Sequence, residues 1–246
     1  MNNNTLYIVM PAYNEEGNIS DVVSQWYPII DKLGGDSRLV VFDDGSKDNT
    51  YERMKELQQP YPLLVAETKP NSGHGATCWY AYQYALEHGA DYVFQTDSDG
   101  QTHPDEFWKF WQQRQNYDLL IGSRVHRRDG FLRIIVTKVL KLLVRLTFGV
   151  DVKDANTPFR LMKRNFLSDV LQIIPEKSFL ANVVMSAIAV KQKRKIFWSP
   201  ITFAPRTKGK SLVNVKSIFK IGVRAIGDFK KINKLVRAGL KPAAYN

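Results

Sequence analysis

The 246-residue sequence has a single cysteine, Cys78, and lacks a long apolar run. One cysteine forms no internal disulfide, which is typical of a protein kept in a reducing compartment. In the C-terminal half the longest uncharged stretch, Ser178 to Val190, has 13 residues and contains Asn182 and Ser186, so it is too short and too polar to span a bilayer. The first residues, Met1 to Asn4, have neither a basic n-region nor an apolar h-region. We therefore expect a cytoplasmic protein without a secretory signal.

The sequence also lacks internal repeats and low-complexity tracts. Apolar residues make up 44% and aromatic residues 12%, which is typical of a folded chain, and the length suits one large domain with a C-terminal appendage. The net charge of +11 is unevenly placed, because residues 206–246 carry +10 and residues 124–145 carry +6. Two basic segments on an otherwise acidic body predict an anionic partner, although solvated helix faces would give the same pattern.

Short apolar runs alternate with helical patterns in the first half of the chain. The runs expected to be strands are Leu6 to Met10, Leu39 to Phe42, Leu63 to Ala66, Tyr92 to Gln95 and Leu119 to Ile121. The segments expected to be helices are Glu16 to Leu33, Asp48 to Leu57, Gly75 to His88 and Pro104 to Gln115. This alternation predicts an α/β fold with a mainly parallel sheet and helices on both faces. Ligands bind at the carboxyl ends of the strands in such a sheet.

Two basic segments are amphipathic. In Phe131 to Phe148 the cations Lys138, Lys141 and Arg145 are spaced three and four residues apart among apolar residues. The second segment has an apolar stripe of Val215, Ile218, Phe219, Ile226, Phe229, Ile232 and Val236 opposite Lys216, Lys220, Lys230, Lys231 and Lys234. Such helices lie in a membrane interface or pack on a core. We expect a catalytic domain at 1–210, with the first amphipathic helix within 124–150, and a membrane-interface segment at 211–246. That segment would attach the protein peripherally to the cytoplasmic face of a membrane.

Acidic residues follow the predicted strands. After the fourth strand, Asp97, Asp99 and Gln101 are each two residues apart, so on an extended strand end they would face one cation. Their hard oxygens suit Mg²⁺ or Mn²⁺, which leave positions open for the phosphates of a diphosphate ligand. Asp43-Asp44-Gly45-Ser46 follows the second strand, where carboxylates can accept hydrogen bonds from a base and a ribose. In Asn71 to Ala76 two glycines would let the backbone approach a ligand. Each motif alone could be only a turn or a helix cap.

Together, in this order and at these strand ends, the motifs resemble those of the family 2 glycosyltransferases of the GT-A fold. The resemblance covers about residues 5 to 210 and is carried by Pro11-Ala12-Tyr13-Asn14-Glu15, Asp43-Asp44-Gly45-Ser46, Asp97-x-Asp99-x-Gln101 and Gly122-Ser123-Arg124. More narrowly, the chain is similar to the dolichyl-phosphate mannose synthase and polyprenyl-phosphate glycosyltransferase branch. That likeness is carried by Arg124, Arg133, Thr137, Asp154-Ala155-Asn156-Thr157-Pro158-Phe159-Arg160 and Arg206-x-Lys208-Gly209-Lys210-Ser211.

The resemblance implies inverting transfer of a sugar from a UDP- or GDP-sugar to a polyprenyl or dolichyl phosphate, with Mg²⁺ or Mn²⁺ bound by Asp97, Asp99 and Gln101. The residues expected to contact the nucleotide are Pro11, Ala12, Tyr13, Glu15, Asp43, Asp44, Ser46, Gly75, Asp97 and Ser98. The lipid phosphate is expected at Arg124, Arg133, Thr137 and Lys210. The expected catalytic set is Asp99, Arg124, Arg133 and Arg206, and arginine forks do match phosphate geometry.

Other functions stay open at this point. A family 2 enzyme that glycosylates a saccharide hydroxyl needs a general base, and its common Gln-x-x-Arg-Trp run is missing because Gln192-Lys193-Arg194-Lys195 lacks the Trp. A nucleotide-binding membrane adaptor without catalysis is a second alternative. We expect no nucleic-acid binding, because the basic tail lacks an aromatic-basic motif. A membrane-protein partner or a homo-oligomer is compatible with the sequence.

Two features set the chain apart from the branch. Relatives often carry an acidic residue where this chain has Phe179-Leu180-Ala181-Asn182, and many have C-terminal transmembrane helices. The first difference leaves the identity of the sugar open, and the second is a reason to expect peripheral membrane attachment. Among the four histidines, His103 is nearest in sequence to the expected metal site, and we expect it to cap a helix or to support a metal ligand rather than to bind the metal itself.

Overall fold

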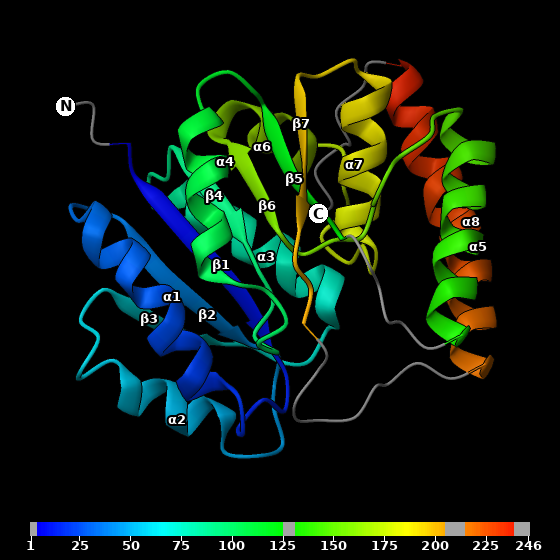
Figure 1. Ribbon diagram of the computed structural model, residues 1–246. Coiled ribbons are helices and arrows are strands. Elements are labelled where there is room, and N and C mark those ends of the chain that lie inside the picture. The colour runs from blue at the N-terminus through cyan, green and yellow to red at the C-terminus, as the bar shows by residue number, and fades with distance from the viewer. Residues whose placement is uncertain (1–3, 125–130, 205–214, 239–246) are drawn as a thin grey trace.

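The computed structural model describes residues 4–124, 131–204 and 215–238, without the side chains of 131–136 and 215–224. A seven-stranded sheet with the order β3-β2-β1-β4-β6-β5-β7 forms its centre (Figure 1). The strands are β1 (Leu6–Ala12), β2 (Arg38–Asp43), β3 (Leu64–Thr68), β4 (Tyr92–Gln95), β5 (Leu119–Arg124), β6 (Arg160–Lys163) and β7 (Ile196–Ile201). Only β6 runs antiparallel to its neighbours, β4 and β5. The predicted mainly parallel α/β sheet is confirmed.

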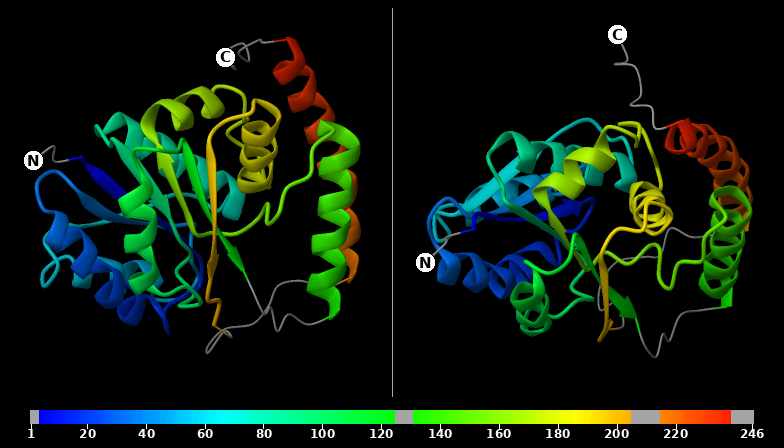
Figure 2. Two further views of the ribbon diagram at one scale, coloured as in Figure 1. Left: turned by 45° about the horizontal axis from the view of Figure 1, so that its top comes forward. Right: turned by 90° about the horizontal axis from the view of Figure 1, so that it is seen from above.

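Helices cover both faces of the sheet (Figure 2). They are α1 (Ile19–Leu33), α2 (Thr50–Leu57), α3 (His74–Glu87), the short 3-10 turn η1 (Pro104–Glu106), α4 (Phe107–Gln113), α5 (Phe131–Phe148), α6 (Arg164–Leu171), α7 (Ala181–Lys191) and α8 (Val215–Ala238). Side chains of β1 alternate between two cores, since Ile8 packs with α1, α2 and α4 whereas Val9 packs with α3, α6 and α7. This double coverage explains why the central strands read as continuous apolar runs.

Four elements after β5 were not predicted, namely β6, α6, α7 and β7. The helix α7 is buried almost all round, so its sequence has no apolar period that would indicate a helix. Strand β6 has only four residues and follows the loop that begins at Asp154. Strand β7 contains Pro200, which is tolerated because β7 is the edge strand of the sheet.

The two amphipathic segments form α5 and α8, which lie side by side at one edge of the molecule (Figures 1 and 2). The ring centroids of Phe148 and Phe229 are 5.6 Å apart, and Asn233 Nδ2 donates a hydrogen bond to the carbonyl of Thr147 at 2.7 Å. Phe229 and Ile232 are each only 1% exposed. This part of the predicted apolar stripe therefore belongs to the core. In the described part of the chain, no helix is long and apolar enough to cross a membrane.

Candidate active site

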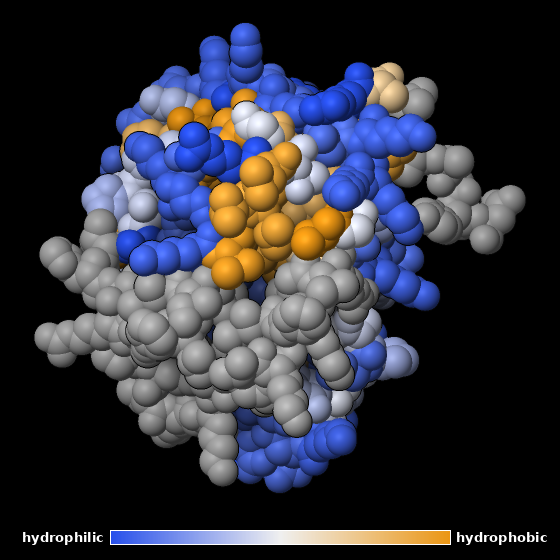
Figure 3. Space-filling view, turned by 90° about the vertical axis from the view of Figure 1, so that its right-hand side faces the viewer, coloured by the Kyte–Doolittle hydropathy of each residue, from blue (hydrophilic) through white to orange (hydrophobic). Residues whose placement is uncertain are grey.

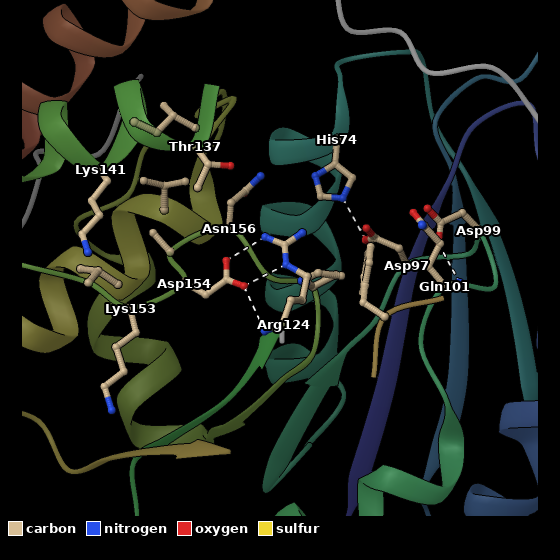
Figure 4. Close-up of a pocket in the computed structure, with 16 residues that line it drawn as sticks. His74, Asp97, Asp99, Gln101, Arg124, Thr137, Lys141, Lys153, Asp154 and Asn156 are labelled. Atoms are coloured by element: carbon tan, nitrogen blue, oxygen red, sulfur yellow. Dashed lines mark hydrogen bonds and ion pairs between the residues drawn. The ribbon is translucent and has the colours of Figure 1, made fainter. Parts of the chain in front are cut away.

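Two cavities open at the carboxyl ends of the parallel strands. The first, of about 300 Å³, is lined by Pro11, Ala12, Tyr13, Glu15, Asp44, Asn71, Gly73, His74, Thr77, Asp97, Ser98 and Asp99. The second, of about 310 Å³, is lined by His74, Asp97, Asp99, Gln101, Arg124, Thr137, Leu140, Lys141, Val152, Lys153, Asp154, Ala155, Asn156, Pro158, Val183 and Phe203 (Figure 4). His74, Asp97 and Asp99 line both cavities. These three side chains therefore form a shared wall, and a group bound there can face both spaces.

Most of the expected nucleotide ligands line the first cavity, but three do not. The Asp43 carboxylate accepts hydrogen bonds from the backbone N–H of Ser46 at 3.1 Å and from the hydroxyl of Thr68 at 2.9 Å. The Ser46 hydroxyl in turn accepts the N–H of Asn14 at 2.9 Å. Asp43 and Ser46 thus support the loops behind the cavity. Their contact with a nucleotide remains a prediction.

Gly75 is the third such residue. A Cβ built on it would lie 2.4 Å from the backbone carbon and oxygen of Phe179, closer than any real contact. The glycine is therefore required so that α3 can pack against the loop before α7, which places His74 and Thr77 at the cavity. A direct contact between Gly75 and a ligand stays a prediction.

Asp44 holds the loop that forms one side of the first cavity. Its carboxylate accepts the backbone N–H groups of Ser72 and Gly73, both at 2.9 Å, and an ion pair from Lys69. Burial alone would raise the pKa of Asp44, but the hydrogen bonds from Lys69 and Ser72 outweigh it and keep the pKa below its ordinary value. The carboxylate thus stays charged and anchors a loop that includes Asn71, whose side chain donates to the Asp44 carbonyl at 2.8 Å.

The acidic turn after β4 brings Asp97 and Asp99 to the same wall. Between them, the Ser98 hydroxyl donates a hydrogen bond to the backbone carbonyl of Pro11 at 2.8 Å, which ties the turn to the end of β1. Gly100 has a φ of 72°, so the extended geometry expected through Gln101 ends there. The Gln101 side chain still lines the second cavity, and its Nε2 donates to the carbonyl of Ala204 at 2.7 Å.

This turn fits a divalent cation. Among the described residues no three His, Cys, Asp or Glu side chains form a ready cluster. Mg²⁺ and Mn²⁺ sites typically use one or two carboxylates and complete the shell with water and phosphate oxygens. Asp97 and Asp99 supply two such carboxylates on a wall that faces open space on two sides.

His74 is a site residue that the sequence analysis missed. Its Nε2 lies 3.0 Å from Oδ1 of Asp97 (Figure 4). Its Nδ1 lies 3.7 Å from the sulfur of Cys78. The sulfur of Cys78 and the carboxylate of Asp97 favour the imidazolium, and so raise the pKa of His74 well above its ordinary value. The available signal was its place directly after Gly73 in the glycine-rich run that opens α3.

A buried polar network supports Asp97 from below. Gln95 Nε2 donates to Asp97 Oδ1 at 3.2 Å, while Gln95 Oε1 accepts hydrogen bonds from Asn182 Nδ2 at 2.8 Å and from the Tyr82 hydroxyl at 2.9 Å. Asn182 is 3% exposed. The Asn182 side chain therefore lies in the core and holds Gln95.

Arg124 dominates the opposite side of the second cavity. Its Nε and Nη2 donate to the two carboxylate oxygens of Asp154 at 2.8 and 2.7 Å, which is a bidentate pair (Figure 4). The Phe203 ring centroid lies 5.1 Å from the guanidinium carbon. Asp154 and Phe203 therefore fix the direction of the arginine while it faces the cavity.

The remaining expected phosphate ligands are only partly described. Thr137 and Lys141 of α5 line the second cavity together with Lys153. The side chains of Arg133, Arg206 and Lys210 lie outside the described residues. The second cavity thus places Arg124, Lys141 and Lys153 around a space that also touches the acidic wall, an arrangement that can hold an anion a short distance from a cation-bound diphosphate.

Comparison with known proteins places this geometry among sugar transferases. The family described as Glycosyl transferase family 2 matches residues 7–171. A UDP-N-acetylglucosamine--dolichyl-phosphate N-acetylglucosaminyltransferase of Methanococcus voltae is 28% identical over 216 residues, which cover 80% of this chain and 84% of that protein. A polyprenol monophosphomannose synthase of Mycolicibacterium smegmatis is 24% identical over 86% of this chain and 82% of its own length. An undecaprenyl-phosphate 4-deoxy-4-formamido-L-arabinose transferase of Shewanella sediminis is 27% identical over 70% of this chain but only 52% of its own length.

A solved structure of similar fold is the glucosyl-3-phosphoglycerate synthase of Mycobacterium tuberculosis, crystallised with Mn²⁺, UDP-glucose and phosphoglyceric acid. It is 19% identical, has a TM-score of 0.65, and the match covers 98% of this chain and 81% of that one. At this identity the likeness shows the fold alone, and it confirms the expected GT-A architecture.

Proposed function

This chain belongs to glycosyl transferase family 2, and we propose that it transfers a sugar from a UDP- or GDP-sugar to a polyprenyl or dolichyl phosphate at a membrane surface. The observation that carries the proposal is the wall of Asp97 and Asp99 shared by two cavities, one of which also holds Arg124. The names of the three relatives above specify a dolichyl, polyprenol or undecaprenyl phosphate acceptor or product, which supports the acceptor class.

The donor would lie with its nucleoside in the first cavity and its diphosphate at the shared wall. There the carboxylates of Asp97 and Asp99 and the side-chain amide oxygen (Oε1) of Gln101 would hold Mg²⁺ or Mn²⁺. When bound, the ion would neutralise charge on the leaving diphosphate. The loop held by Asp44 would form the floor beneath the nucleoside.

The acceptor phosphate would lie in the second cavity beside Arg124. A phosphate monoester has a second pKa of about 6, so it is largely a dianion at neutral pH and needs no protein base to become a nucleophile. Asp154 is already paired with Arg124 and is poorly placed to act as such a base. A phosphate oxygen would attack the anomeric carbon while the bond to the diphosphate breaks on the opposite face, with inversion.

The outward face of α5 and α8 would rest on the membrane. Leu142 and Leu146 are 54% and 73% exposed, and Ile226 of α8 is 39% exposed. Figure 3 shows an apolar patch over these helices, with hydrophilic side chains above it and at its sides. The exposed cations on the two helices include Lys138, Lys141, Arg145, Lys230, Lys231, Lys234 and Arg237. An apolar patch on helices that also carry exposed cations suits an anionic lipid surface. Because α5 also lines the second cavity, a lipid phosphate could enter along it.

A transfer assay tests the proposed reaction. Labelled UDP- and GDP-sugars are incubated with undecaprenyl phosphate, with undecaprenol or with a free saccharide, in Mn²⁺ or in EDTA. We expect label in the lipid only with the phosphate acceptor and only with the metal. Transfer to the saccharide or to undecaprenol at a comparable rate would contradict the acceptor assignment.

Liposome sedimentation tests the membrane face. Deleting α8 would uncover the core at Phe229, so a surface change is the better probe. The double variant Leu142→Glu/Leu146→Glu should lose binding to phosphatidylglycerol vesicles, because it places two charges in the patch. The charge-matched control Gln59→Glu/Gln112→Glu changes two exposed side chains elsewhere and should sediment like the wild type. Equal sedimentation of both variants would rule out this face.

A further inference from the structure

Gln101 joins the acidic turn to the chain at residue 204, and this link reaches Arg124. We propose that Gln101 is a positioning residue that couples occupancy of the cation site to the placement of Arg124, through Phe203 and Ala204. The inference rests on the proposed function, because it assigns the cation to the acidic turn and the acceptor phosphate to Arg124.

The first half of the link consists of two hydrogen bonds. Gln101 Nε2 donates to the Ala204 carbonyl at 2.7 Å, and the Ala204 N–H donates to the Gln101 carbonyl at 2.8 Å. The Gln101 residue is 5% exposed, so water competes little for these groups. Two bonds of opposite direction fix both the position and the orientation of the peptide at residue 204.

The second half of the link is the aromatic ring of Phe203. Its centroid lies 5.1 Å from the guanidinium carbon of Arg124, within the range of a cation–π contact. Asp154 holds the same guanidinium through its Nε and Nη2. Two residues therefore hold the Arg124 guanidinium: Asp154 through hydrogen bonds, and Phe203, which directly precedes Ala204, through its ring. A displacement of residue 204 changes the second contact and leaves the first.

The chemistry of the amide makes Gln101 suited to this role. An amide has one carbonyl oxygen and one NH₂ group, and here the NH₂ group is bound to Ala204. The carbonyl oxygen is the atom with which Gln101 would hold a cation. With that oxygen on a cation, the amide of Gln101 would be more polarised, and its NH₂ group would donate a stronger hydrogen bond to the Ala204 carbonyl. Binding of cation and of acceptor phosphate would then favour each other, and linkage requires the effect to be reciprocal.

The matched test is Gln101→Glu. Glutamate keeps the length of the side chain and an oxygen for the cation, but it has no N–H for the Ala204 carbonyl. Gln112→Glu is the control, because it makes the same chemical change at an exposed position of α4. A second pair, Phe203→Leu and Phe203→Tyr, changes the ring contact without altering any expected metal ligand.

The experiment measures binding of farnesyl phosphate, a short soluble prenyl phosphate, by calorimetry with and without Mn²⁺ and UDP or GDP. Mn²⁺ affinity is measured separately by electron paramagnetic resonance. In the wild type and in Gln112→Glu we expect the Mn²⁺–nucleotide to tighten farnesyl phosphate binding by about 5-fold or more, the lower end of typical couplings. In Gln101→Glu and Phe203→Leu, the ratio of farnesyl phosphate affinities with and without Mn²⁺–nucleotide should fall to about 1 while Mn²⁺ still binds. Phe203→Tyr keeps the ring and should keep the wild-type ratio.

A wild-type ratio in Gln101→Glu would overturn the inference and leave the proposed function intact. So would a ratio near 1 in the wild type itself, provided that farnesyl phosphate binds. If the wild type binds no farnesyl phosphate in any condition, the acceptor assignment fails and the inference fails with it. These results are distinguishable because each variant is compared with its own binding in the absence of nucleotide.

Discussion

Replacing Gly75 by alanine tests how closely α3 must approach the loop before α7. The new methyl group would lie 2.4 Å from the carbon and oxygen of the Phe179 backbone and 2.5 Å from the Ser178 carbonyl oxygen. Ordinary contacts begin near 3.4 Å, so helix and loop must separate by about 1 Å. The atoms are backbone, which cannot rotate away as a flexible side chain could. Overpacking costs about 1–3 kcal/mol, and we expect the upper end here.

Both stability and activity should respond to Gly75→Ala. At roughly 2–4 °C per kcal/mol for a domain of this size, a loss of about 3 kcal/mol lowers the Tm by about 6–12 °C. The same shift moves His74 and Thr77 at the cavity, and a misplacement of about 1 Å can cost about 100-fold in turnover. Thermal unfolding and the transfer assay measure the two effects.

Gly227→Ala is the matched control. Gly227 also lies in a helix, α8, and a Cβ there meets nothing within 4 Å. Alanine is favoured over glycine in a helix interior by about 1 kcal/mol, so this variant should gain stability. The two alanine variants should therefore change the Tm in opposite directions. A Gly75→Ala protein with the wild-type Tm and turnover would refute the argument.

Three further predictions concern the charges of the site. Asp99→Asn should weaken Mn²⁺ binding by about tenfold or more, because it removes a carboxylate ligand, and unchanged Mn²⁺ resonance spectra would contradict the metal assignment. Asp154→Asn leaves Arg124 without its buried charged partner, so the free energy of unfolding should fall by about 3–5 kcal/mol. The KM for the prenyl phosphate should rise as well, because Arg124 is no longer held in place. An unaltered KM would count against the phosphate role of Arg124. The pKa of Asp44 lies below its unfolded value of about 3.9, so its charge stabilises the fold above that pH and the contribution is lost as pH falls through the folded pKa. The free energy of unfolding, measured with denaturant, should thus fall more steeply below about pH 4 for the wild type than for Asp44→Asn. Parallel curves would contradict a stabilising contribution from the Asp44 charge and its contact with Lys69.

The first five strands were predictable because each is a short apolar run bounded by turn residues. Burial on both faces requires such runs, as at Leu39 and Val41 in one core and Val40 in the other. The same reasoning fails after β5. There α7 has no polar face to reveal its period, and β6 enters the sheet between β4 and β5 from a loop more than 30 residues farther along the chain.

The site was predictable where neighbouring strand ends bring motifs together. Asp97 and Asp99 meet the Pro11 to Glu15 loop because β4 and β1 are adjacent and parallel. The contacts that orient these groups were not predictable. The Arg124–Asp154 pair and the Gln101–Ala204 bonds join residues 30 and 103 positions apart, and no local pattern encodes such pairings. The role of His74 was not predictable for the same reason, since its partner Asp97 lies 23 residues away.

The central claim is that a divalent cation at the acidic turn joins the nucleotide diphosphate to the protein between the two cavities. A crystal grown with Mn²⁺ and a nucleoside diphosphate sugar tests it most directly, with data collected at the manganese absorption edge. We expect one anomalous peak in contact with Asp97, Asp99 and the diphosphate oxygens. A bound donor whose diphosphate lies away from these carboxylates, with no anomalous peak between them, would contradict the account.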